Sequence, residues 1–337
     1  MNRNLDIAVY DAGSLAGEAL LSLLDERNFP VATLYPLAES PDPDASVSFK
    51  GEELDVLNAA GFNFVDADLL FIPAHCPLSK AIVDNAIEAG CLVIDGSLNV
   101  SKASAILASV NPEQVADAVE GKHLIVPSSP AALMLPVLKP IQEAIGIDSV
   151  SVTACLSVSG SGNDGITELR GQTVDLLNGK PVKKSLYSQR VAYNLLPEVG
   201  EIEQSGFSTE ELAIIDDVMA VLDDQNIRVS PTCVRAPVFF GDSLSVHLEL
   251  DKPVDSDTAR DLLTVVDGVQ VLPAGEIPTV EALAGDNSLS GEVMVGRIRQ
   301  NPVFPEQLSF WLVADTLKRG AINSIELAEI LLKDFLK

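Results

Sequence analysis

One stretch of the chain, CVRAPVFFGDS over residues 233–243, holds a cation and a carboxylate close together. Arg235 is followed seven residues later by Asp242. A guanidinium either pairs with a nearby carboxylate of the protein or binds a carboxylate ligand through its fork of N–H groups. An aspartate with an ordinary pKa of about 4 is a poor base for a hydroxyl group. We therefore expect an Arg235–Asp242 ion pair, with ligand binding as the alternative role of Arg235.

A second candidate is the segment YDAGSLAG over residues 10–17, which joins the first predicted strand to the first predicted helix. In dinucleotide-binding folds, this turn carries glycines that let the backbone approach a pyrophosphate at the helix N-terminus. Gly13 and Gly17 fit that use. The other two positions hold Asp11 and Ser14, and a carboxylate at a helix N-terminus satisfies free N–H groups and repels phosphate. Asp11 is therefore expected to cap the helix, and retained nucleotide binding is the alternative.

A third candidate is the pair His75–Cys76, which follows a predicted strand. Adjacent imidazole and thiol groups are the components of an activated nucleophile, although an ordinary loop cysteine would give the same pattern. None of the cysteines has CxxC spacing, so we expect free thiols in a reducing compartment, without zinc or disulfides. The four cysteines are Cys76, Cys91, Cys155 and Cys233.

The order of predicted elements indicates the fold class. The first half of the chain alternates short apolar strands with helices, which is typical of a parallel sheet covered on both faces. From about Ser149 the strands are longer and separated by fewer helices, the pattern of an α+β domain. We expect an α/β protein with a Rossmann-like domain over 1–128 plus 315–337 and an α+β domain over 129–314. The last predicted helix, 316–335, returns to the first domain.

Composition excludes several classes of protein. The 337 residues carry a net charge of −27, which disfavours nucleic-acid and anionic-membrane binding. Hydrophobic content is 47%, yet no apolar run approaches the length of about 18 residues that spans a bilayer. The N-terminus lacks the pattern of a signal peptide. A cytoplasmic protein is expected.

The stretch 233–243 resembles the active-site strand of aspartate-semialdehyde dehydrogenases, where R-x-P-V-x-x-G-H-S carries a substrate-binding arginine and a catalytic histidine. The resemblance places Arg235 at the arginine and Asp242 at the histidine. The segment PSSPAALMLPVLKPI is similar to the family's nucleophile helix, and counting back from Lys139 places Ser129 at the catalytic cysteine. Both the thiol and the imidazole of the family are therefore replaced. A Ser129 hydrolase is disfavoured, because Asp242 is the wrong base, and Ser129 is expected to cap the helix.

The resemblance implies further site positions. Leu156 stands where the family's Y-Q-A-V-S-G motif has its substrate-contacting glutamine. The family's phosphate-binding arginine maps near Ser101 or Lys102, of which Lys102 carries a positive charge. The cofactor-binding positions implied by the resemblance are Asp11, Gly13, Ser14, Gly17, His75 and Cys76.

The likeness extends nearly from end to end, with stretches such as VGRIR and WLVADTLKRGAINS, and is greatest to the usg-type paralogues of the family. It implies NADP as the cofactor, a role linked to amino-acid biosynthesis, and a homodimer formed through the sheet of the second domain. Because the reactive residues differ, we expect the NADP-dependent reductive dephosphorylation of aspartyl phosphate to be lost. A scaffold, partner or ligand-sensing role follows, including a possible heterodimer with an active homologue. The alternative is an active NAD(P)-dependent aldehyde oxidoreductase of altered substrate that uses Cys76 or another thiol.

Overall fold

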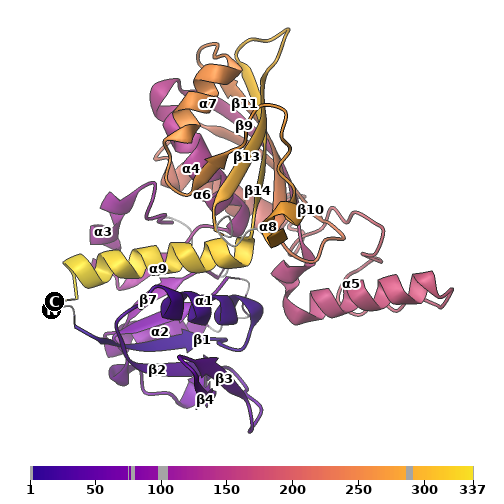
Figure 1. Ribbon diagram of the computed structural model, residues 1–337. Helices are drawn as coiled ribbons and strands as arrows, with labels where there is room; N and C mark the ends of the chain where they lie inside the picture. The colour runs from indigo at the N-terminus through magenta and orange to yellow at the C-terminus, as the bar shows by residue number, and fades with distance from the viewer. Residues whose placement is uncertain (1–2, 75, 77–79, 98–104, 286–290, 337) are drawn as a thin grey trace. The chain divides into compact units, whose positions relative to one another are not determined.

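A computed structural model describes residues 3–336 apart from 75, 77–79, 98–104 and 286–290. The chain forms two compact units: unit 1 comprises residues 1–128 and 320–337, and unit 2 comprises residues 129–319 (Figure 1). The domain boundaries expected from the sequence, 1–128 plus 315–337 for the first domain and 129–314 for the second, stay a prediction. Among the described residues, no helix is both long and apolar enough to cross a membrane.

Unit 1 is built on a parallel sheet with strand order β5-β2-β1-β6-β7-β8. The order reverses between β1 and β6, so the carboxyl ends of these two strands flank the place where such sheets bind ligands. The strands are β1 (Leu5–Tyr10), β2 (Val31–Ala38), β5 (Leu57–Asn58), β6 (Leu69–Ile72), β7 (Leu92–Asp95) and β8 (His123–Ile125). The predicted α/β order of the first half is confirmed.

Both faces of this sheet are buried. Successive residues of β1 alternate between two apolar clusters, with Ile7 and Val9 in one and Ala8 and Tyr10 in the other. The first cluster includes side chains of α1 and α9, and the second includes those of α2, which is why the strands read as continuous apolar runs. The helices of unit 1 are α1 (Leu15–Glu26), α2 (Lys80–Ala89), α3 (Val115–Glu120) and the C-terminal part of α9 (Thr316–Asp334), with 3-10 turns η1 (Ala59–Gly61), η2 (Phe64–Asp66) and η3 (Pro112–Gln114). A hairpin of β3 (Ser46–Phe49) and β4 (Glu52–Asp55) is an addition that the sequence did not predict.

Unit 2 is built on a mixed sheet with strand order β10-β9-β11-β14-β13-β12. Helix α4 packs against β9 and β14 and contacts α6 and α7, so these helices cover one face (Figure 1). Burial alternates along β11, which leaves the other face partly exposed. The strands are β9 (Ile147–Leu156), β10 (Arg228–Arg235), β11 (Asp242–Leu250), β12 (Val269–Val271), β13 (Val293–Gln300) and β14 (Gln307–Ala314). The helices are α4 (Ser129–Ala144), α5 (Gly162–Leu177), α6 (Thr209–Val221), α7 (Ser256–Thr264) and α8 (Val280–Gly285), with the 3-10 turn η4 (Val158–Ser161). The predicted α+β character of the second half is confirmed.

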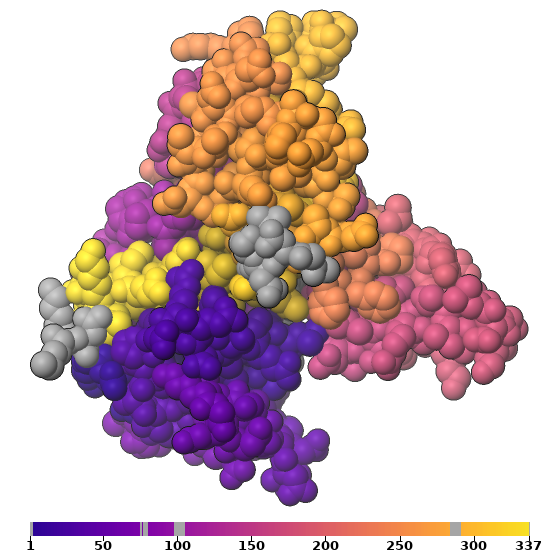
Figure 2. All heavy atoms as spheres, viewed as in Figure 1, coloured from indigo at the N-terminus to yellow at the C-terminus, as the bar shows by residue number. Residues whose placement is uncertain are grey.

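Two features of unit 2 stand out along the chain. A capping box, with reciprocal hydrogen bonds between Ser208 and Glu211, starts α6. Helix α5 and the segment after it, residues 178–207, form an arm that extends from the sheet of the same unit (Figures 1 and 2). The arm exposes several large apolar side chains: Val174, Leu177, Leu186, Tyr193, Leu195 and Ile202.

Candidate functional site

One end of the unit 2 sheet gathers the residues that the sequence singled out. Strands β9 and β10 are parallel, and their last residues, Leu156 and Arg235, are paired there. Strand β11 runs the opposite way and begins at the same end with Asp242. The residue before it, Gly241, has a φ of +80°, and a Cβ there would lie 2.9 Å from Leu283 Cδ1, so the turn into β11 requires glycine.

The carboxylate of Asp242 is bound to the residue that follows β9. Its Oδ1 atom accepts a hydrogen bond from the backbone N–H of Ser157 at 2.7 Å and another from Ser157 Oγ at 2.9 Å. Ser157 Oγ also lies 2.9 Å from Ser159 Oγ. All three residues are buried, with Asp242 5% exposed and Ser157 1% exposed. Asp242 therefore serves as a structural acceptor for Ser157.

Arg235 approaches the same residue from the neighbouring strand. Its Nη1 donates to the carbonyl oxygen of Ser157, and the side chain is 6% exposed. The Nε–H of Arg235 is buried and has no hydrogen-bond partner among the described residues. An unpaired buried donor costs free energy, and a bound carboxylate would satisfy it. Arg235 and Asp242 thus meet at Ser157, and the predicted direct ion pair between them stays a prediction.

Ser129 belongs to the same end of the sheet. Helix α4 ends at Ala144 and β9 begins at Ile147, so helix and strand run in opposite directions along the sheet. The start of α4 therefore lies near the end of β9. Ser129 is the first residue of α4, and its expected role as the helix cap stays a prediction. Leu156, at the family's glutamine position, is 3% exposed and contributes an apolar side chain to the core.

The thiols of the chain are not activated. All four cysteines are free thiols in this structure. Burial raises the pKa of each of them. For Cys155, which neighbours β11, the charge of Asp242 adds to the effect of burial. Cys76 is 5% exposed, and the charges of Asp11 and Asp95 raise its pKa further. A thiolate is the reactive form of cysteine, so none of these groups is a ready nucleophile at neutral pH.

This burial predicts slow alkylation of the folded protein. At pH 7, iodoacetamide is expected to label Cys76 at least about tenfold more slowly than free cysteine, because raised pKa values deplete the thiolate. The rate should keep rising with pH beyond the ordinary thiol pKa of about 8.5. Mass spectrometry of the labelled protein measures both, and labelling in urea, which should modify all four cysteines, is the control. Rapid labelling of Cys76 in the native protein would contradict this account.

In unit 1, the turn after β1 has a different cap from the one expected. Ser14 is the N-cap of α1, and its Oγ accepts from the N–H of Gly17 at 3.1 Å. Asp11 lies earlier, in a left-handed conformation with φ of +50°. Burial raises the pKa of the Asp11 carboxyl, and a hydrogen bond with Ser14 opposes the rise. The prediction that Asp11 caps the helix is therefore wrong, because the serine three residues later reaches the first turn.

Two glycines shape this turn. A Cβ at Gly17 would lie 2.5 Å from the backbone oxygen of Asp11, so α1 requires glycine to start this close to the strand. A Cβ at Gly13 would meet nothing within 4 Å, so this position faces open space. His75 and Lys102, expected at the cofactor and phosphate positions, lie outside the described residues. Within the described residues, no group of three or more metal-binding side chains occurs.

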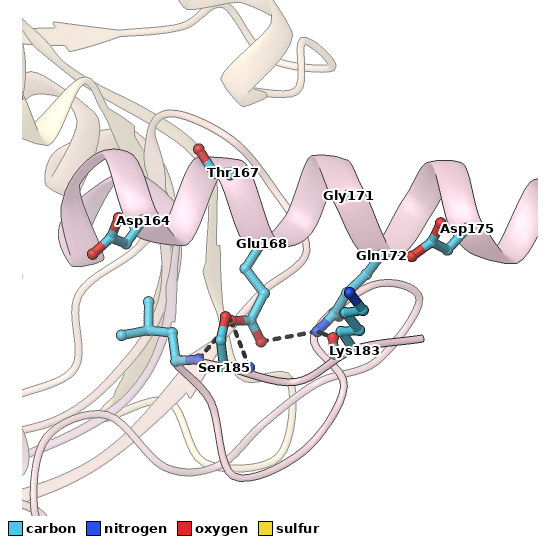
Figure 3. A pocket seen from close by; sticks show the side chains of 9 residues that line it. Asp164, Thr167, Glu168, Gly171, Gln172, Asp175, Lys183 and Ser185 are labelled. Carbon is cyan, nitrogen blue, oxygen red and sulfur yellow. Dashed lines mark hydrogen bonds between the residues drawn. The ribbon is translucent and has the colours of Figure 1, made fainter. Parts of the chain in front are cut away.

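The arm of unit 2 contains a pocket of about 420 Å³ that is distinct from these positions. Figure 3 shows that Glu168 of α5 points at the following loop. Its carboxylate accepts hydrogen bonds from Ser185 N, Ser185 Oγ and Leu186 N at 2.6–3.2 Å, and from Gln172 Nε2 at 2.9 Å. Gln172 in turn accepts from the N–H groups of residues 191 and 192. The polar lining is thus engaged in folding the arm onto α5.

The Glu168 network makes the arm sensitive to acid. Burial raises the pKa of Glu168, but the hydrogen bonds from Ser185 and Leu186 outweigh burial and leave it lowered. A lowered folded pKa gives stability that is present above the unfolded pKa of about 4.3 and is lost as pH falls through the folded value. We expect Glu168→Ala to remove about 2–4 kcal/mol of local stability at neutral pH. Hydrogen exchange of amides 183–192 measures it, with exposed Glu203→Ala as the control. Unchanged protection in Glu168→Ala would contradict the anchoring role.

Comparison with known proteins identifies the family. Residues 6–118 match the family model for the semialdehyde dehydrogenase NAD binding domain, and residues 138–319 match the model for the semialdehyde dehydrogenase dimerisation domain. The chain belongs to the semialdehyde dehydrogenase family. This member is 39% identical over 343 residues to an aspartate-semialdehyde dehydrogenase of Legionella pneumophila, in a match that covers 100% of this chain and 98% of that protein. It is 37% identical over 339 residues to a USG-1 protein homolog of Pseudomonas aeruginosa, with 100% of both chains covered.

Solved structures agree with the family. The crystal structure of aspartate semialdehyde dehydrogenase II from Vibrio cholerae superimposes with a TM-score of 0.92 and 33% identity, over 99% of this chain and 100% of that one. The resemblance expected from the sequence, to aspartate-semialdehyde dehydrogenases and usg-type paralogues, is confirmed. This semialdehyde dehydrogenase family member accordingly has an NAD-binding-type unit and the dimerisation domain of its family.

Ser157, at the centre of this site, was not predicted from the sequence. It contacts both Asp242 and Arg235. A signal was available, because the motif Y-Q-A-V-S-G has alanine at this position and the chain has a hydroxyl there. In the fold, this hydroxyl donates a hydrogen bond to the Asp242 carboxylate.

Proposed function

We propose that this chain is a member of the aspartate-semialdehyde dehydrogenase group that lacks the NADP-dependent reductive dephosphorylation of aspartyl phosphate. It would act as a binding or partner protein in the cytoplasm. The observation that carries the proposal is the double hydrogen bond from Ser157 to Asp242 Oδ1, at 2.7 and 2.9 Å. The sequence resemblance assigns this buried carboxylate to the position of the family's general base.

A carboxylate in this setting is unsuited to general-base work. Its Oδ1 lone pairs are engaged by Ser157, and a carboxylate is a far weaker base than the alkoxide it would need to form. Loss of a general base costs typically about 10²–10⁴-fold in rate. Ser129, which the resemblance assigns to the nucleophile position, carries a hydroxyl, and a hydroxyl is a weak nucleophile without an adjacent base. The two replacements act on the same step, which supports loss of the family reaction.

Arg235 supports retention of binding without turnover. Its buried Nε–H lacks a partner in the described structure, and its guanidinium is held in place by Ser157. A small carboxylate ligand would complete its hydrogen bonding. The family's dimerisation domain over 138–319 supports a homodimer, and the same surface supports pairing with a catalytically competent homologue.

The alternative, an active aldehyde oxidoreductase that uses Cys76, has less support. Burial and two nearby carboxylates raise the pKa of this thiol, which is the opposite of activation. No described cysteine has the lowered pKa that a thiolate nucleophile requires.

The test is a steady-state assay of pure protein, made in a host strain without its own aspartate-semialdehyde dehydrogenase. Aspartate semialdehyde, inorganic phosphate and NADP⁺ or NAD⁺ are supplied, and formation of the reduced nicotinamide is followed. We expect turnover at least about 10⁴-fold below that of a competent family member assayed in parallel. Turnover within about 100-fold of that enzyme would sink the proposal.

A further inference from the structure

The carboxyl edge of the unit 1 sheet, between β1 and its neighbours, carries an unusual set of acidic groups. Asp11 directly follows β1, and Glu39 directly follows β2, which pairs with β1 in register Tyr10–Leu37. Ligands of open α/β sheets bind at this edge, next to the point where the strand order reverses. The chemistry of these residues therefore decides which nucleotide the edge accepts.

Glu39 has the position of a ribose ligand. It is exposed and lies 22 residues after Gly17, the last glycine of the turn. In dinucleotide-binding folds, an acidic residue about 20 residues beyond the glycine turn accepts hydrogen bonds from the free ribose hydroxyls. The same carboxylate repels a phosphate on that ribose, which carries a charge of about −1.5 to −2.

The neighbouring sequence offers no cation to a ribose phosphate. The segment 39–45 contains Glu39, Asp42 and Asp44, and no lysine or arginine occurs between residues 28 and 49. An arginine is the usual partner of a 2′-phosphate at this edge. The segment thus favours a ribose with a free 2′-hydroxyl over a ribose that carries a 2′-phosphate.

Tyr10 supplies an independent observation at the same edge. This last residue of β1 is 1% exposed, and its hydroxyl has no hydrogen-bond partner among the described residues. Burial, followed by the charges of Glu39, Cys76 and Asp11, raises its pKa to about 12, so the phenol stays protonated near these groups. A buried donor without an acceptor is costly unless a ligand or an ordered water completes it.

Asp11 and Ser14 weaken the binding of a dinucleotide's pyrophosphate at the turn before α1. Ser14 Oγ already takes the N–H of Gly17, one of the donors that a helix N-terminus offers to phosphate. The Asp11 carboxylate adds repulsion at the same turn. Binding at this edge must therefore depend on the ribose more than on the phosphates, and NADP(H) does not fit the residues present.

We propose that this edge selects a nucleotide whose adenosine ribose has free 2′- and 3′-hydroxyls, of the NAD(H) type, and rejects NADP(H). Glu39 is the residue that determines the choice. The selection concerns binding in unit 1, so it does not depend on whether the chain turns over a substrate.

The test is isothermal titration of the full-length protein with NADH and with NADPH at fixed ionic strength. We expect NADH to bind at least about tenfold more tightly, Glu39→Ser to narrow that ratio, and Glu39→Arg to reverse it. Glu52→Ser, an exposed substitution on β4, is the matched control and should leave the ratio unchanged. Equal or tighter binding of NADPH by the unmodified protein would overturn the proposal, and so would no binding of NADH up to about millimolar. Neither result would alter the turnover test of the proposed function.

Discussion

Asp242→Ala is expected to lower the free energy of unfolding by about 3–5 kcal/mol, a large effect for the loss of one carboxylate. The substitution removes the acceptor of Ser157 N–H and Ser157 Oγ in a buried site, so the N–H loses its acceptor and the Oγ keeps only its contact with Ser159 Oγ. Unpaired buried donors keep their full desolvation cost. At about 2–4 °C per kcal/mol, the thermal midpoint should fall by roughly 6–20 °C.

Two further variants serve as controls for Asp242→Ala. Asp242→Asn keeps an acceptor oxygen of the same shape, so we expect less than half the loss seen with alanine. Asp267→Ala removes an exposed carboxylate of the same unit and should change stability by no more than about 0.5 kcal/mol. A loss for Asp242→Ala as small as that of Asp267→Ala would show that the carboxylate is not a structural acceptor.

The second large effect concerns the reactivity of residue 129. We expect the double variant Ser129→Cys with Asp242→His to react with iodoacetamide at residue 129 at least about 100-fold faster than Ser129→Cys alone. In the single variant, a nearby carboxylate disfavours a thiolate, as it does for Cys155, whose pKa Asp242 raises in addition to burial. An imidazole in its place removes that repulsion and stabilises the thiolate when protonated.

Labelling rates from pH 6 to 9, followed by peptide mass spectrometry, measure the pKa of the introduced thiol without any nucleotide. The native cysteines provide an internal reference, because burial makes them slow. Equal rates in the single and double variants would mean that residues 129 and 242 do not share a site.

The fold was predictable to a large extent because apolar pattern and capping chemistry act locally. The alternation of strands and helices, the Ser208 capping box and the last helix all follow from short stretches of sequence. The β3–β4 hairpin was missed because its strands are short, and SVSF and EELD carry little apolar content.

The candidate site was predictable only where a motif carried it. Arg235 and Asp242 were found because they lie on one recognisable strand. Ser157 was not, because its partner is 85 residues away and only the pairing of β9 with β11 brings them together. The cap of α1 was wrongly assigned to Asp11. The left-handed φ that keeps Asp11 out of the helix cannot be predicted from its residue type.

A double-mutant cycle in urea unfolding, with Ser157→Ala, Asp242→Ala and the pair, tests whether Asp242 is a structural acceptor. If Ser157 hydrogen-bonds Asp242 in the folded protein, both single variants lose this same interaction, and its contribution to the free energy of unfolding is counted in each. The pair should then lose about 1–3 kcal/mol less than the sum of the single variants. Because Ser157→Ala keeps the backbone N–H, the cycle measures the contact of the Ser157 hydroxyl with Asp242. Losses that add to within about 0.5 kcal/mol would show that this hydroxyl does not hold Asp242, and would contradict its structural role.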